Sequence, residues 1–183
     1  AVYLEYLYGL NLFETVSFSQ NDVARTKQYQ DESQRVKFQK SFHNEADFLS
    51  SLEMVAEVSA FTSFNIPRVA QLTQRSNQFN LRTIRYTEDE LYQLIENANF
   101  INFAFSLTDK FGDNGLIGVV ILEKMNDKQL FINTWLMSCR VLKRGMEHFM
   151  LHSVTTFAYQ NGYSEIIAEY IPTPKNKMVE SFY

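Results

Sequence analysis

Residues 138–151 read SCRVLKRGMEHFML, and this stretch decides how the rest of the chain is interpreted. An apolar run precedes it and a pattern with one buried face follows it, so it is predicted to join a strand to a helix. The start of a helix presents backbone N–H groups and a positive dipole end, which bind phosphate. Arg140, Lys143 and Arg144 add charge there, and Gly145 lets the backbone come close to a ligand. The stretch fits a phosphate or pyrophosphate site, but so short a run taken alone favours the alternative, a basic, solvated surface turn.

Composition narrows the class of protein. The chain has 183 residues, of which 45% are hydrophobic and 15% aromatic, enough for a packed core. The net charge of −4 gives no general attraction to nucleic acid or to anionic membranes, so neither is an expected partner. Apolar runs such as residues 119–122 are too short to span a bilayer, and the chain does not open on a signal-peptide pattern. The single cysteine, Cys139, excludes an internal disulfide and fits a reducing compartment, so a cytoplasmic protein is expected.

The first part of the chain, residues 1–52, has helical and mostly polar patterns. We expect a short helix within residues 1–10, a long helix over residues 19–40 and a third helix over residues 46–52, which Asn44 caps. The apolar positions of the long helix are Val23, Tyr29, Val36 and Phe38. So few apolar positions predict that this helix leans on another element or on a partner.

The second part, residues 53–183, has the pattern of an α/β (α+β) domain. We expect a strand, two helices, three strands, a helix, a strand and a last helix. The predicted strands cover about residues 54–61, 101–107, 115–124, 129–138 and 165–171. The predicted helices cover about residues 66–76, 88–98 and 146–160, with the last one starting near residue 173. Thr87 and Glu90 have the spacing of a capping box, and the apolar run GLIGVVILEK indicates a central strand covered on both faces.

The order of these elements resembles the fold of the GNAT superfamily of N-acetyltransferases. Arg140 and Gly145 match the ends of the motif Arg/Gln-x-x-Gly-x-Gly/Ala before the family's third helix, and Lys143 stands where the family usually has glycine. The resemblance implies a GNAT-like acyl-CoA N-acyltransferase fold, with a mixed, mainly antiparallel sheet and helices on both faces. It favours the phosphate site over the solvated turn.

A second GNAT motif lies at the end of the chain. Asn176 and Tyr183 match the ends of the pattern Asn-x-x-Ala-x-x-x-Tyr in the family's last helix, with Val179 in place of alanine. The family's last strand would follow this helix. We therefore expect the GNAT-like domain of residues 53–183 to be truncated before its last strand.

Longer runs resemble FkbH-like proteins, which join a haloacid-dehalogenase (HAD) domain of subfamily IIIC to a GNAT-like domain. The runs are SLEM, RVAQLTQRSNQFNLRTIRYT, DKFGDNGLIGVVI, SCRVLKRGME and EYIPTPKN. Such proteins load glyceryl units onto acyl carrier protein in polyketide and related pathways. The resemblance implies that residues 1–52 are a connector after a missing HAD domain, and that this domain and acyl carrier protein are partners. No Asp-x-Asp nucleophile motif occurs, so no phosphatase activity is expected in this chain.

The GNAT resemblance also implies which residues hold the donor, coenzyme A or the phosphopantetheine arm of acyl carrier protein. The arm would lie in a cleft between the strand ending at Ser138 and the strand of residues 165–171, whose ends diverge. The residues assigned to cofactor binding are Leu136, Met137, Ser138, Arg140, Val141, Lys143, Arg144, Gly145, Met146 and Asn176. Tyr183 would protonate the departing thiolate. Alternatively, Tyr183 is one more packed aromatic among ten tyrosines.

Two more residues are candidates for catalysis. Glu169 lies on a predicted strand beside the expected cleft and could act as general base, but its alternation with Glu165 also fits a solvated edge, which we favour. Cys139 could accept an acyl group, although a lone cysteine at a strand end is more often inert packing. His148 and His152 lie one helical turn apart on the polar face without an HExxH pattern, so no metal site is expected.

The segment QRSNQFNLRTIRYT between the first two helices of the domain is rich in amides. In the GNAT fold this loop borders the acceptor site, which makes Asn77, Gln78, Asn80 and Arg82 candidates for binding a polyhydroxylated or acyl substrate. A hydrogen-bond network that fixes a long loop is the alternative. Two functions remain open: an acyltransferase that uses a thioester donor, and a non-catalytic module that grips the pantetheine arm for the HAD domain.

Overall fold

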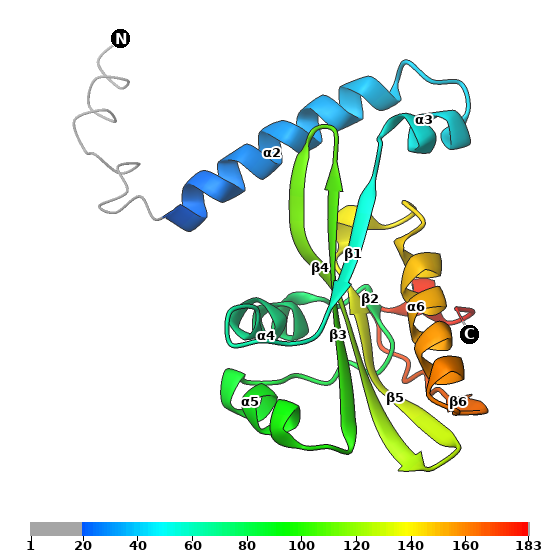
Figure 1. Cartoon of the computed structure of the whole chain (residues 1–183). Coiled ribbons are helices and arrows are strands. Elements are labelled where there is room, and N and C mark those ends of the chain that lie inside the picture. Colours follow the sequence, from blue (N-terminus) through cyan, green and yellow to red (C-terminus); the bar gives the residue numbers. More distant parts are fainter. Residues whose placement is uncertain (1–19, 183) are drawn as a thin grey trace. The chain divides into compact units, whose positions relative to one another are not determined.

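The computed structural model describes residues 20–182, which divide into two compact units: unit 1 ends at His43, and unit 2 begins at Asn44 (Figure 1). The predicted helix within residues 1–10, the first residue of the predicted long helix, Ser19, and the predicted catalytic Tyr183 lie outside the described residues. The predicted connector of residues 1–52 covers unit 1 and the first helix of unit 2. No helix in residues 20–182 has the length and apolar character needed to cross a membrane.

Unit 1 contains one long helix, α2 (Gln20–Gln39), where the sequence predicted it. Tyr29 is 78% exposed and Val36 is 43% exposed, so two of its four apolar positions face solvent. Phe38 packs edge-to-face against Phe42 with ring centroids 4.8 Å apart. This packing is local to the end of the helix.

Unit 2 is built on a six-stranded sheet with the order β1-β3-β4-β5-β2, and β6 also pairs with β5. The strands are β1 (Val55–Ser59), β2 (Phe79–Asn80), β3 (Phe100–Asp109), β4 (Gly112–Asn126), β5 (Gln129–Met137) and β6 (Glu165–Ile167). The pair β5–β6 is parallel and the other pairs are antiparallel. The predicted mixed, mainly antiparallel sheet is confirmed.

Helices cover both faces of this sheet, as predicted (Figure 1). The helices of unit 2 are α3 (Glu45–Ser51), α4 (Ile66–Arg75), α5 (Glu88–Glu96) and α6 (Met146–Gln160), with short 3-10 turns η1 (Cys139–Val141) and η2 (Lys177–Val179). α4 and α5 pack on one face, which includes Val119 and Ile121, whereas α6 packs on the other, which includes Val120 and Leu122. Successive residues of a strand point to opposite faces, so β4 is buried on both sides. Full burial of each such side chain contributes about 1.5–3 kcal/mol.

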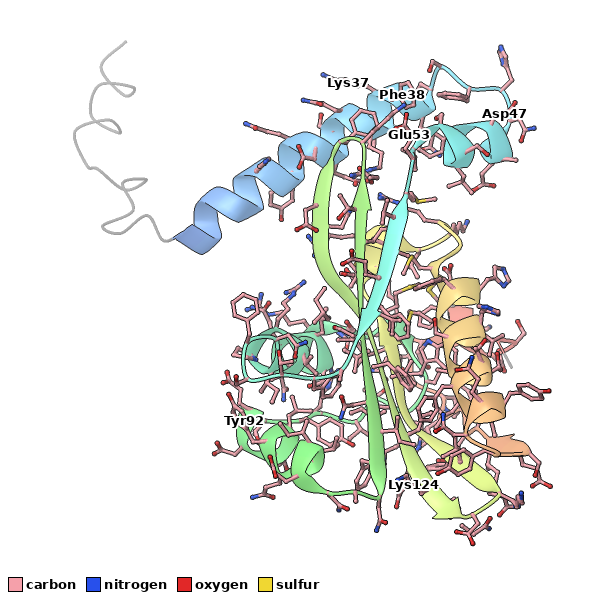
Figure 2. All side chains as sticks on the ribbon, in the orientation of Figure 1. Lys37, Phe38, Asp47, Glu53, Tyr92 and Lys124 are labelled. Carbon is pink, nitrogen blue, oxygen red and sulfur yellow. The ribbon has the colours of Figure 1, made fainter. Side chains whose placement is uncertain are left out.

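Local hydrogen bonds fix the ends of these elements. The capping box of α5 is present: the Thr87 side chain accepts from the Glu90 amide, and the Glu90 carboxylate accepts from the Thr87 amide. Asn44 caps α3 by accepting from the Ala46 amide at 2.8 Å. The side chain of Lys124 donates to the Ala98 carbonyl at 2.7 Å, which ties the far end of β4 to the chain after α5 (Figure 2).

The structure differs from the sequence prediction in three elements around one edge of β5. The strand β2 was not predicted. The strand predicted over residues 165–171 ends at Ile167, because β2 occupies the edge of β5 beyond that point and Ile171 donates its amide to Leu81 instead. The helix predicted from residue 173 is, in the described residues, only the short turn η2. It follows Asn176, whose side chain is engaged by the preceding turn and by β2.

Candidate functional site

The loop between β5 and α6 contains two residues in an unusual backbone conformation. Lys143 has φ +62° and Gly145 has φ +81°, both in the left-handed region. This region favours glycine, because a Cβ there crowds the following carbonyl oxygen. Lys143 therefore adopts a backbone conformation that is more usual for glycine. Gly145 forms the N-cap of α6 and makes no side-chain cap.

The three cations of this loop differ in their surroundings. The Arg140 guanidinium lies beside Ser138, with Nε 3.4 Å from the Ser138 hydroxyl. The Lys143 side chain is exposed. Arg144 is mostly buried and pairs with the fully buried Asp109 at 3.3 Å, and Asp109 also accepts two amides of the turn between β3 and β4. Arg144 thus ties the loop to that turn, while Arg140 and Lys143 remain the stronger candidates for contacting a phosphate.

A carboxylate already lies at the start of α6. Glu147, in the first turn, accepts a hydrogen bond from the Lys143 amide at 3.0 Å. The positive end of the helix dipole stabilises such a side chain. An anion bound in this loop would replace the Glu147 carboxylate or share the site with it.

The edge of β5 next to this loop is occupied by β2. Leu136 pairs with Asn80 and Met137 pairs with Phe79, and the Leu81 amide donates to the Trp135 carbonyl at 3.1 Å. The same edge pairs with β6 only at residues 129–131. β5 and the segment after β6 do diverge as predicted, but the backbone edge expected to be free at Leu136 and Met137 is filled by the chain itself.

Asn176 joins β2 to the segment after β6. It is fully buried, and its Nδ2 donates to the carbonyls of Asn80 at 2.8 Å and Ile171 at 3.0 Å. Its Oδ1 accepts from the Thr173 amide at 2.7 Å. Both N–H groups of this amide therefore have protein acceptors. The structure brings Asn176, predicted to bind the cofactor, against Asn80, predicted to bind the substrate.

Hydrogen bonds hold most of the amide-rich loop. Asn80 donates to the Ser76 carbonyl and accepts from the Thr83 amide. Asn77 accepts from Arg85, while Gln78 is exposed. The bonds of Asn77 and Asn80 are of the kind expected for a network that fixes the loop.

A group of polar side chains surrounds Asn133 in the middle of β5, where the pairing with β4 shifts register. Arg82 donates to the Asn133 carbonyl at 2.9 Å and to the Glu169 carboxylate at 2.8 Å. The Tyr86 hydroxyl donates to Asn133 Oδ1 at 2.6 Å. Burial raises the pKa of Tyr86, and a hydrogen bond with the Thr134 side chain opposes this effect. Arg82 and Glu169, predicted separately, are thus brought together.

Sequence reasoning missed the central residue of this group. Asn133 is one polar residue in the run QLFINTWLM, and its position inside a buried strand was a usable signal. Tyr86 carried no comparable signal, because it is one of ten tyrosines. Its pairing with Asn133 depends on the path of the whole loop.

The remaining predicted residues lie apart from this group. Cys139 is exposed at the start of η1, whereas the next-but-one residue, Val141, is fully buried. Met146, the first residue of α6, is buried. Within residues 20–182, no three His, Cys, Asp or Glu side chains converge as a metal site would need.

Solved structures resemble this arrangement of sheet and helices. The ribosomal-protein-S18-alanine N-acetyltransferase of Escherichia coli matches with a TM-score of 0.53 at 13% identity, over 70% of this chain and 74% of that one. Ard1 of Thermoplasma volcanium matches with a TM-score of 0.53 at 14% identity, over 69% of this chain and 78% of that one. Unit 2 has the GNAT fold.

A further matching structure contains CoA. Rv2747 of Mycobacterium tuberculosis, in complex with CoA and NLQ, matches with a TM-score of 0.50 at 14% identity, over 64% of this chain and 66% of that one. No family model matches the sequence, and no curated protein is significantly similar to it. The likeness to GNAT structures is therefore one of fold.

Proposed function

We propose that unit 2 is an acyltransferase domain that binds the phosphopantetheine arm of coenzyme A or of an acyl carrier protein and transfers an acyl group. The observation that carries this proposal is the loop before α6. Lys143 and Gly145 both adopt left-handed conformations at the start of a 15-residue helix, so backbone amides and two cations can surround a pyrophosphate. The GNAT fold of unit 2 agrees with this use of the loop.

We further propose that the chain derives from an FkbH-like protein. Its long sequence runs support this origin, with a glyceryl group as the acyl unit, and with acyl carrier protein and a HAD domain of the same parent chain as partners. Residues 1–52 then act as the connector between the two domains. The single cysteine supports a cytoplasmic location.

In this proposal the loop residues bind the donor, and other groups act as the acid and base that transfer protons. Arg140 and Lys143 contact the phosphates, and Arg144 positions the loop through Asp109. Tyr183 is the proposed acid for the departing thiolate. Glu169 is a general-base candidate only if it leaves Arg82, because the Arg82 guanidinium now occupies one of its carboxylate oxygens.

A second candidate function is a non-catalytic module that grips the pantetheine arm and presents it to the HAD domain. One observation favours it: the carboxylate of Glu169, the general-base candidate, is engaged by Arg82. The two functions use the same phosphate loop. They differ in whether this chain consumes an acyl thioester, which mass spectrometry of the incubated thioester measures.

The decisive experiment for the shared donor site is calorimetry with coenzyme A. The double variant Arg140→Ala/Lys143→Ala should weaken binding by roughly 1–3 kcal/mol, the scale of lost hydrogen bonds to charged groups. The matched control is Lys27→Ala/Lys37→Ala, which removes two exposed cations from α2 and so changes the net charge equally. Equal affinities in the wild type and the loop variant would reject the proposed site.

A further inference from the structure

The edge of β5 carries two different partners along its length. Its first residues pair with β6 in parallel, and its last residues pair with β2 in the antiparallel sense. β2 is firmly placed: Phe79, Asn80 and Leu81 are each at most 3% exposed. The Phe79 ring packs edge-to-face on Phe182, with centroids 5.1 Å apart.

A donor arm that starts at the α6 loop would need this same edge. The pantetheine chain has about twelve backbone atoms, equal to about four residues, so when extended it spans roughly 13 Å. Starting beside Ser138, an arm running back along β5 passes Met137 and Leu136 and ends near Thr134. Its amides could pair there only with backbone groups that β2 now uses.

Two contacts hold β2 from its outer side. The Ile171 amide donates to the Leu81 carbonyl at 2.8 Å, and the Asn176 side chain donates to the Asn80 carbonyl at 2.8 Å. Both come from the segment after β6, the element that would form the other wall around the arm. The residues that close this edge are thus the ones that must separate for an arm to enter.

We propose that residues 79–81 act as a strand gate: the segment fills the place of the donor arm in the free protein and leaves it when the arm binds. Asn176 is the latch of this gate, because its buried amide bonds to both sides. This inference rests on the proposed donor site at the α6 loop. The gate makes donor binding weaker than an open edge would, since the bonds of β2 must first be broken.

Amide hydrogen exchange of the wild-type chain tests the gate directly. On saturation with coenzyme A, the amides of Leu81 and Ile171 should exchange at least tenfold faster, because their acceptors are released. The Lys124 amide, which donates to Asn99 at 2.8 Å away from β2, serves as the unaffected control. If coenzyme A binds while Leu81 and Ile171 stay protected, the gate is wrong and the donor site stands.

A latch variant tests the same idea through affinity. Asn176→Asp keeps the shape of the side chain but removes the Nδ2 donor and both of its hydrogen bonds. Only the bond to the Asn80 carbonyl holds β2, so coenzyme A should bind about fivefold more tightly, the factor that one hydrogen bond supplies. A ligand contact made by Asn176 itself would give the opposite sign. Asn161→Asp is the matched control, because Asn161 Nδ2 also donates to a carbonyl, that of Phe157, at the exposed end of α6.

Inorganic pyrophosphate separates failure of the gate from failure of the donor site. It reaches only the α6 loop, so it should bind the wild type and Asn176→Asp equally. Equal binding of coenzyme A as well, without faster exchange at Leu81, overturns the gate alone. If neither ligand binds either protein, the donor site is overturned and the gate with it.

Discussion

At the scale of single residues, Lys143 has a backbone conformation that side chains with a Cβ rarely adopt. A residue with a Cβ in the left-handed conformation costs roughly 1–2 kcal/mol, yet φ of Lys143 is +62°. Such strain is found where a site needs a particular backbone path. The lysine keeps that path and adds a charge that glycine could not supply.

Substitutions at Lys143 separate the conformational effect from the charge. Lys143→Gly should be more stable to denaturant unfolding than Lys143→Ala by about 0.5–1 kcal/mol, since relief of strain exceeds the extra entropy of unfolded glycine. Both variants lose the same cation, so both should weaken coenzyme A binding equally. Free energies of unfolding from urea titrations provide the measurement.

The control for Lys143 is an exposed position with ordinary helical geometry. At His152 in α6, glycine should be less stable than alanine by about 1 kcal/mol, so the order reverses. The same order at both positions would mean that the left-handed backbone of Lys143 is not a source of strain.

At the scale of elements, a local sequence signal, the capping box of Thr87 and Glu90, fixes the start of α5. Thr87→Ala removes the hydroxyl that accepts the Glu90 amide and leaves that amide without its cap. We expect the free energy of unfolding to fall by about 1 kcal/mol. Thr155→Ala in α6 is the control: the Thr155 hydroxyl bonds back to the Leu151 carbonyl within the helix, a contact that slightly disfavours helix. A loss at Thr155 as large as that at Thr87 would contradict the capping account.

The capping box, the helices α2 to α6 and five of the strands were predictable because their signals are local. Thr87 and Glu90 are three residues apart, and Asn44 lies next to the helix that it caps. β2 was not predictable, because two residues carry no periodicity and their partners, Leu136 and Met137, are far along the chain. The early end of β6 follows from β2, so the same missing knowledge produced both errors.

The residues of the candidate site also fall into two groups, those with a local sequence signal and those whose partners are distant in the sequence. The proposed phosphate loop was predicted from its residue types and spacing, and its role stays a prediction. The pairs Arg82–Glu169 and Asn80–Asn176 join residues 87 and 96 positions apart, and no spacing rule connects them. Their roles as partners, and the polar group around Asn133, emerged only once the fold placed them together.

At the scale of the whole chain, the division into two units leads to a test by truncation. Unit 2 contains both hydrophobic clusters and the entire sheet, so removal of residues 1–43 should leave a domain that unfolds cooperatively. Its affinity for coenzyme A should match that of the full chain, because the proposed donor site lies within unit 2. Thermal unfolding and calorimetry of residues 44–183 provide the measurements.

The outcome of truncation also bears on the proposed connector. A truncated chain that loses cooperative unfolding would show that α2 belongs to the core, and the two-part organisation would have to be withdrawn. A second truncation that also removes α3 provides the comparison. Phe48 and Leu52 are buried, and the Leu52 carbonyl accepts from the Lys110 amide, so this longer truncation should destabilise the domain.

The position of β2 in the sheet also governs the order in which the domain assembles. β3, β4 and β5 are joined by tight turns, so these hairpins close at little entropic cost. β2 must wait until both β5 and the region around Asn176 are in place, because its bonds reach across 96 positions. Contacts of such high sequence separation form late in folding. During synthesis the segment at residue 79 leaves the ribosome well before its partners. Its backbone hydrogen bonds to those partners cannot all form until the chain beyond residue 176 has emerged.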